Sequence, residues 1–335
     1  MPIPFIAIGI GVVASALGIG KSIKAGIDQK DANETNARAR SIAEKATETA
    51  NQKRKASGKA LENLGKKKIF VLDNSMKRFI KAFEMLHNVD LQDSSGVDEL
   101  QKFKIDKQSM EELKEMSSMA SSLAGGTVSG AVLGAITAFG AYGGAMTFGA
   151  ASTGTAIATL SGAAATNATL AFLGGGSLAA GGLGIAGGTA VLGGLVAGPA
   201  LAVLGFVVGA KASANRDSAY SNLAKARKHE EEMKTVCTLC NGIRKRAAMF
   251  QNLLEKMNKI FEPLVYSLEH TIEENGMNFS LYSPQAKENV AAGLAVAGAI
   301  KAILDTPILT EDGRLTKESK DIAISAQKVV DQYEG

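Results

Sequence analysis

Apolar residues recur at alternating intervals of four and three positions from Val236 to Leu268, within a helix expected over residues 212–274. This alternation places them on one face of a helix, and such a heptad seam predicts that the helix packs lengthwise against a second helix. Pro263 lies inside the stretch and predicts a kink or a division into two helices, because proline removes a backbone donor. The seam consists of Val236, Cys240, Ile243, Ala247, Phe250, Leu254, Met257, Phe261, Leu264 and Leu268.

Other stretches are predicted to be helical from composition, spacing or capping. Residues 27–64 are rich in Ala and charged residues and contain no Pro, which favours helix. Gly65 and the three lysines that follow it are typical of a helix end. Apolar residues at three-to-four spacing predict an amphipathic helix over 70–89. Further helices are expected over 107–117, over 284–304 with Ser283 as the cap, and over 316–333 with Thr316 as the cap.

The stretch from Met116 to Ala210 contains no Asp, Glu, Lys or Arg, although charged residues make up 21% of the chain. A helix needs about 20 apolar residues to cross the hydrocarbon core of a bilayer. Residues 124–149 and 187–210 meet that requirement, and residues 151–186 between them form a tip, a re-entrant piece or a third helix. We therefore expect a Gly/Ala-rich hairpin that inserts into a membrane. The alternative is a buried core, but the block has few large side chains to fill one at normal density.

Glycines recur every four residues within this apolar block. On a helix they form a strip without side chains, which lets two backbones approach closely in lipid. In water each glycine weakens a helix by up to ~1 kcal/mol relative to alanine, so the pattern favours close packing over intrinsic helicity. The expected packing positions are Gly126, Gly130, Gly134, Gly140, Gly144, Gly184, Gly188, Gly194, Gly198, Gly205 and Gly209.

Residues 1–24 form a second apolar segment, which contains the sequence Gly-Lys-Ser at positions 20–22. A phosphate-binding loop would need glycine at position 15, where this chain has Ser15. No alternating series of strands and helices follows it, so a nucleotide-binding enzyme is the least favoured alternative. The preferred interpretation is an apolar helix, with membrane boundaries marked by Lys21, Lys24 and Lys211.

The sequence contains no group of residues that predicts catalysis, a cofactor or a bound metal. Cys237 and Cys240 form a Cys-x-x-Cys pair, but there is no second pair to complete a zinc site. Because Cys240 is also a seam residue, structural packing is the preferred interpretation of both thiols. The net charge of +4 arises from basic residues spread among acidic ones. We therefore expect neither a nucleic acid nor a small-molecule substrate as the partner.

The predicted architecture consists of long charged helices around a Gly/Ala-rich hairpin, together with an apolar N-terminal helix. It resembles the α-helical pore-forming toxins and the colicin-like and apolipoprotein-L-like channel formers. Residues 166–206 also resemble bacterial glycine-zipper proteins. The resemblance implies an all-α, elongated helical bundle with long coiled-coil helices, which oligomerises and permeabilises membranes as a toxin or bacterial defence effector. It assigns no catalytic residue. A resident membrane scaffold or tether without channel activity is the alternative.

The chain is expected to divide into five consecutive segments. The expected partners are a lipid bilayer and further copies of the chain. The expected location is a bacterial inner membrane, or water followed by insertion into a target membrane. The segments are an apolar N-terminal helix (1–24), a charged helical segment (25–117), a Gly-rich hydrophobic membrane segment (118–210), a heptad helix (211–275) and a C-terminal helical segment (276–335).

Overall fold

The computed structural model describes residues 19–89, 105–125, 136–137, 139–143, 216–310 and 314–334. The chain divides into two compact units. Unit 1 comprises Met1–Ala46 and Ala202–Glu232, and unit 2 comprises Thr47–Leu201 and Met233–Gly335. The two longest helices each contribute residues to both units.

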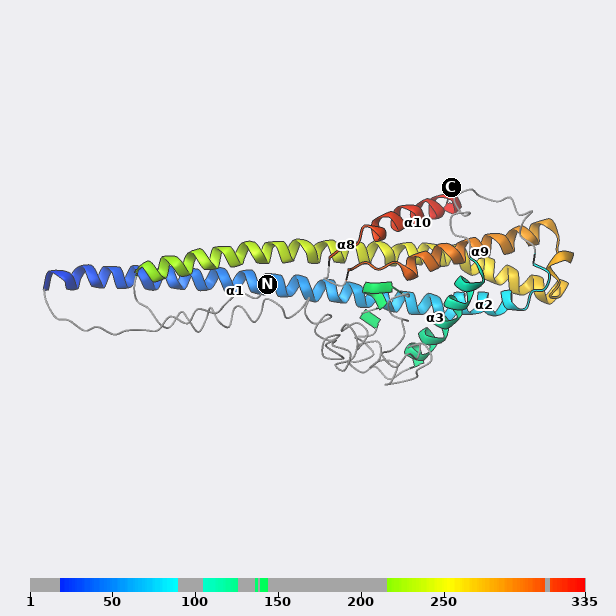
Figure 1. The fold of residues 1–335 in the computed structure, drawn as a ribbon, viewed down its shortest axis with the longest axis horizontal. Coiled ribbons are helices and arrows are strands. Elements are labelled where there is room, and N and C mark those ends of the chain that lie inside the picture. Colours follow the sequence, from blue (N-terminus) through cyan, green and yellow to red (C-terminus); the bar gives the residue numbers. More distant parts are fainter. Residues whose placement is uncertain are drawn as a thin grey trace. The chain divides into compact units, whose positions relative to one another are not determined.

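The regular structure of the described residues is helical, and no β-strand occurs among them. The predicted all-α class is therefore confirmed for this part of the chain. Figure 1 shows the helices in sequence colours. They are α1 (Ile19–Val71), the π-helix η1 (Leu72–Met76), α2 (Lys77–Glu84), α3 (Lys107–Gly125), α8 (Arg216–Asn275), the 3₁₀-helix η5 (Phe279–Leu281), α9 (Pro284–Asp305) and α10 (Glu318–Glu334).

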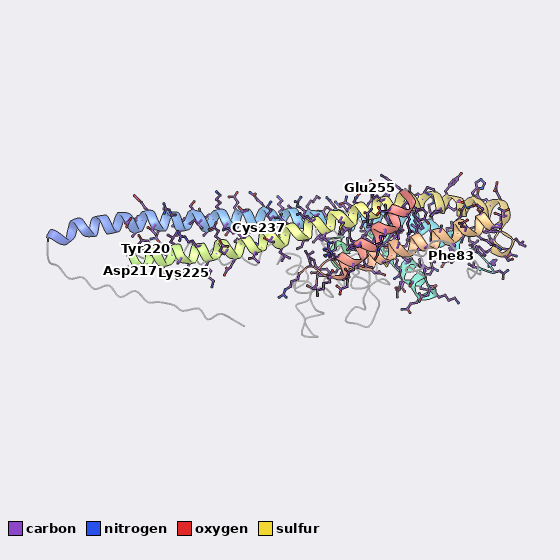
Figure 2. All side chains as sticks on the ribbon, turned by 90° about the horizontal axis from the view of Figure 1, so that it is seen from above. Phe83, Asp217, Tyr220, Lys225, Cys237 and Glu255 are labelled. Atoms are coloured by element: carbon purple, nitrogen blue, oxygen red, sulfur yellow. The ribbon has the colours of Figure 1, made fainter. Side chains whose placement is uncertain are left out.

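In unit 1, the described parts of α1 and α8 pack through small side chains. Ala39 and Ala43 of α1 meet Leu223 and Ala226 of α8 in a minor apolar cluster. The Asn222 side-chain amide also donates to the Asn36 side-chain oxygen at 3.0 Å. The surface of this part of α8 is polar, with Asp217, Tyr220 and Lys225 projecting from it (Figure 2).

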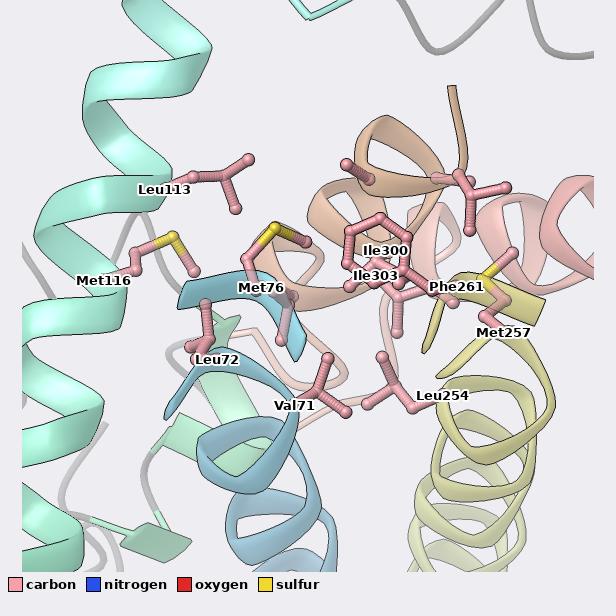
Figure 3. Close-up of a cluster of buried hydrophobic side chains, with 14 of the residues drawn as sticks. Val71, Leu72, Met76, Leu113, Met116, Leu254, Met257, Phe261, Ile300 and Ile303 are labelled. Carbon is pink, nitrogen blue, oxygen red and sulfur yellow. The ribbon is translucent and has the colours of Figure 1, made fainter. Parts of the chain in front are cut away.

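In unit 2, helices from both ends of the chain enclose one hydrophobic core (Figure 3). The end of α1 and η1 supply Val71, Leu72 and Met76, and the other elements pack against them. A ring contact with centroids 5.2 Å apart joins Phe79 of α2 to Phe261 of α8. The remaining labelled side chains are Leu113 and Met116 of α3, Leu254 and Met257 of α8, and Ile300 and Ile303 of α9.

The predicted helix end at Gly65 is wrong, because α1 continues to Val71 and passes through η1 into α2. The lysines after Gly65 do not mark a transition to solvent. Lys66 pairs with Glu62 at 2.6 Å, Lys67 approaches Glu255 at 3.7 Å, and Lys68 is fully buried. Tertiary contacts at this point override the local signals that normally end a helix.

The predicted division of the heptad helix at Pro263 is also wrong, because α8 is one helix from Arg216 to Asn275. An interior proline costs a helix about 3 kcal/mol. Here the proline is exposed, whereas Phe261 and Val265 on either side of it are buried in the same core. Packing on both sides of the proline therefore keeps the helix continuous.

The two C-terminal helices begin close to the predicted caps. The Ser283 hydroxyl accepts a hydrogen bond from the backbone N–H of Ala286 at 3.2 Å, and Pro284 occupies the first turn of α9. The Thr316 hydroxyl accepts from the backbone N–H of Ser319 at 3.3 Å. Helix α10 packs against α9, as Figure 1 shows.

Candidate functional site

The candidate site is the place where part of the apolar block enters the core of unit 2. We call residues 136–137 and 139–143 the docked segment; all of them are helical. Ile136, Phe139, Ala141 and Tyr142 are buried members of the main core. The docked segment lies inside the predicted crossing 124–149, so these residues of that stretch are packed within protein in this structure.

Glycines allow the docked segment to touch the backbone of α1. A Cβ atom added at Gly65 would lie 1.9 Å from the Ile136 carbonyl oxygen. A Cβ atom added at Gly140 would lie 2.1 Å from the Leu61 carbonyl oxygen. Both neighbours are backbone atoms, which cannot rotate aside as a side chain can. Any larger residue at either position therefore pushes the two elements apart.

The docked segment is also fixed to the chain that follows α9. The Ala141 carbonyl accepts hydrogen bonds from the backbone N–H groups of Ile308, at 2.8 Å, and Leu309, at 3.1 Å. Gly143 has a φ of +74°, a left-handed conformation that favours glycine. A Cβ atom there would lie 2.3 Å from the Asp305 carbonyl oxygen. The segment thus lies between α1 and the end of α9.

Lys68 connects the same three parts of the chain. Its ammonium donates to the carbonyl oxygens of Phe139, at 3.2 Å, and Leu304, at 3.1 Å. The nitrogen also lies 5.1 Å from the centre of the Phe139 ring, within the range of a cation–π contact. The side chain is 0% exposed. Lys68 is therefore a buried donor that satisfies two backbone acceptors around the docked segment.

Burial lowers the pKa of Lys68 to about 7, and the nearby Asp305 carboxylate opposes part of that shift. Burial likewise raises the pKa of Asp305, more than its partner Lys301 lowers it. Lys301 binds Asp305 at 2.5 Å and Glu112 of α3 at 2.7 Å. Burial acts to lower the pKa of Lys301, but these two carboxylates outweigh it and raise the pKa. Lys68 thus lies beside a charge network without an ion pair of its own to Asp305.

The structure describes few of the predicted packing and boundary residues. Gly140 is the one predicted packing glycine within the described residues, and it makes the close contact with α1. Lys21 and Lys24 lie in the first turns of α1, and Lys211 lies outside the described residues. The other predicted glycines outside the described residues are Gly126, Gly130, Gly134, Gly144, Gly184, Gly188, Gly194, Gly198, Gly205 and Gly209.

Most of the predicted seam faces the protein interior. Val236 and Leu264 are half-buried, and the buried members are Cys240, Ile243, Ala247, Phe250, Leu254, Met257, Phe261 and Leu268. Burial raises the pKa of the Cys240 thiol, against the effects of Ser57 and Arg54. That environment favours the neutral thiol, which packs as a small apolar group.

Sequence reasoning did not identify Lys68 as a site residue. It occurs in a run of three lysines, and nothing in that run distinguishes the buried one from the two that pair with carboxylates. The signal lies in residues more than 70 positions away, whose carbonyl oxygens need a donor. Such a role becomes visible only when the partners are placed in space.

A second feature of unit 2 is a groove of about 510 Å³ between α2 and α3. It is lined by lysines and serines, which suggests anion binding at first sight. However, Lys77 pairs with Asp73, and Lys114 pairs with Glu84 at 2.6 Å. Carboxylates therefore compensate two of the three lysines that line the groove, and Lys81 adds a single further positive charge.

The described ranges contain neither a candidate membrane crossing nor a candidate metal site. None of the described helices combines the length and apolarity that a bilayer crossing needs. The same residues contain no group of three or more His, Cys, Asp or Glu side chains able to hold a metal ion.

The chain matches no protein-family model, no curated protein and no solved structure.

Proposed function

We propose that this protein inserts its apolar block into a lipid bilayer and permeabilises it, as an oligomerising toxin or bacterial defence effector. The observation that carries the proposal is the absence of charge from Met116 to Ala210 in a chain that is otherwise strongly charged. In the proposed active state, the helices form an elongated bundle and the Gly-rich block forms the inserted hairpin. No catalytic step, cofactor or nucleic acid is part of the proposal.

The structure supports the proposal through the contrast between the helical body and the block. The described helices have charged surfaces and a shared core of large side chains such as Phe250 and Phe261. About half of the residues of the block are instead Gly and Ala, which transfer weakly into lipid. A segment of marginal apolarity can be tolerated in water and still enter a bilayer when several helices assemble through close glycine contacts.

The proposal is tested by dye release from anionic vesicles with the purified full-length chain. Wild-type protein is expected to release the dye, whereas Val196→Asp is expected to abolish release. An Asp at the centre of a crossing helix costs roughly 2.5–3.5 kcal/mol of insertion free energy. Ile324→Asp is the matched control, because it makes the same kind of change at an exposed position of α10.

The outcomes separate the alternatives. Equal release by wild type and Val196→Asp would show that segment 187–210 does not enter the bilayer and would contradict the proposed mechanism. Vesicle flotation without dye release would instead favour the membrane scaffold or tether. If the protein neither binds vesicles nor releases dye at any anionic lipid content, a membrane function is rejected.

A further inference from the structure

Phe139 is one of the largest fully buried side chains in unit 2, and it belongs to the apolar block. Ile136, Ala141 and Tyr142 are buried beside it in the main core. Withdrawal of these side chains would leave a cavity between the remaining helices, which is strongly destabilising in a close-packed core. The docked segment is thus a structural component of the helical body.

We propose that the docked segment remains in the helical body as a fixed anchor, and that only the chain beyond Gly143 enters the bilayer. This inference rests on the proposed function, because it divides the apolar block between the protein interior and the membrane. It replaces the crossing expected over residues 124–149 with a membrane-active part that begins after the anchor.

Backbone contacts on two sides carry the inference. On one side, Gly65 and Gly140 bring the docked segment against the α1 backbone, at distances that no other residue permits. On the other side, the Ala141 carbonyl accepts from Ile308 and Leu309. Release would break both backbone hydrogen bonds and would leave their N–H donors in a largely buried environment.

Lys68 both opposes and favours docking of the segment. Its ammonium would regain water if the docked segment left, and the low pKa of about 7 reflects that desolvation. Departure of the docked segment would also separate the Phe139 and Leu304 carbonyl oxygens, which share Lys68 as their donor. Because the buried aromatic core and the two backbone bonds act with these carbonyl contacts, the anchor is retained despite the buried charge.

The direct test is amide hydrogen exchange at Ile308 and Leu309, the two donors to Ala141. Exchange is measured on the wild-type chain with and without phosphatidylglycerol vesicles, under conditions in which the vesicles lose their dye. The anchor predicts the same protection in both samples. Exchange about tenfold faster with vesicles, a loss of ~1.4 kcal/mol in docking free energy, would overturn it.

A pair of α1 variants tests the anchor from the other direction. Gly65→Ala places a methyl group against the Ile136 carbonyl, whereas Gly58→Ala has open space around it. Both changes raise intrinsic helix propensity equally. Gly65→Ala is expected to speed exchange at Ile308 and Leu309 about tenfold or more and to reduce dye release, and Gly58→Ala is expected to do neither. Faster dye release from Gly65→Ala would identify the contact as inhibitory and overturn the anchor.

A second pair of variants is used if circular dichroism shows that Gly65→Ala has lost helix content. Gly140→Ala meets the Leu61 carbonyl from the opposite side of the contact, and Gly125→Ala meets nothing within 4 Å. The same outcomes are expected for this pair. Dye release together with lost protection in wild type overturns the anchor alone, whereas absence of release from wild type overturns the proposed function and the anchor with it.

Discussion

Lys68 is the residue whose environment departs furthest from what its neighbours in the sequence indicate. A lysine between Lys67 and Ile69 is expected to reach solvent at the end of a helix, yet it is buried and bound to two carbonyl groups. Burial of the ammonium lowers its pKa to about 7. The unfolded chain, with an ordinary lysine pKa, therefore binds one more proton than the folded chain between about pH 7 and pH 10.

This difference predicts that the free energy of unfolding rises with pH above 7. From pH 7 to pH 9 the gain through Lys68 is expected to reach about 2 kcal/mol, since each pKa unit corresponds to ~1.4 kcal/mol. Lys68→Met should remove this rise, because methionine carries no proton. Lys66→Met is the control, since Lys66 is exposed and paired with Glu62. Urea unfolding at both pH values measures the slopes, and comparison between variants cancels the titration of other groups such as Cys240.

The prediction has a clear contrary result. If Lys68→Met shows the same rise as wild type, the ammonium is not desolvated in the folded state and the assignment of a buried donor is wrong. Asp305 cannot produce the rise that is assigned to Lys68, because a raised carboxyl pKa makes stability fall, not rise, as pH increases.

At the scale of elements, the sequence predicted most helices well and two boundaries badly. Spacing identified α8, and capping signals identified α9 and α10. The caps Ser283 and Thr316 were found because a hydroxyl beside free N–H groups is a local signal. The continuation through Gly65 could not be predicted, because Gly65 serves there in a close contact with the Ile136 backbone, more than 70 residues away. The continuity at Pro263 depends on burial on both sides of it, which local propensity does not include.

Pro263 therefore offers a test of how packing overrides propensity. Pro263→Ala restores a helix donor and should raise the free energy of unfolding by up to about 3 kcal/mol. The matched change Pro284→Ala lies in the first turn of α9, where proline is well tolerated, and should have little effect. Thermal unfolding by circular dichroism compares the two. A lower midpoint for Pro263→Ala would mean that the proline itself shapes α8 for packing.

At the scale of the whole molecule, the uncharged block was visible from the sequence, but its division was not. Ile136, Phe139 and Tyr142 look like the rest of the block in composition, and only their contacts with α1 and the end of α9 place them in a core. The predicted site residues of the seam are mostly buried, whereas the predicted glycines other than Gly140 lie outside the described residues. The proposed function therefore rests on the charge pattern of the sequence and on the packing of the docked segment.

The anchor and the start of α8 together predict the topology of the inserted state. If the chain leaves the body after Gly143 and returns to it before Arg216, it crosses the bilayer an even number of times. Charged flanks at 102–115 and 211–228 should then lie on the same side of the membrane.

Single cysteines at positions 107 and 216, in a chain whose Cys237 and Cys240 are replaced by serine, are labelled with an impermeant maleimide on intact vesicles. Both positions should react equally from outside, and a third cysteine at position 58 serves as the reference for the helical body because Gly58 has open space around it. Labelling of 107 from outside and of 216 only after the vesicles are opened would require an odd number of crossings, and a hairpin in the block would then be excluded.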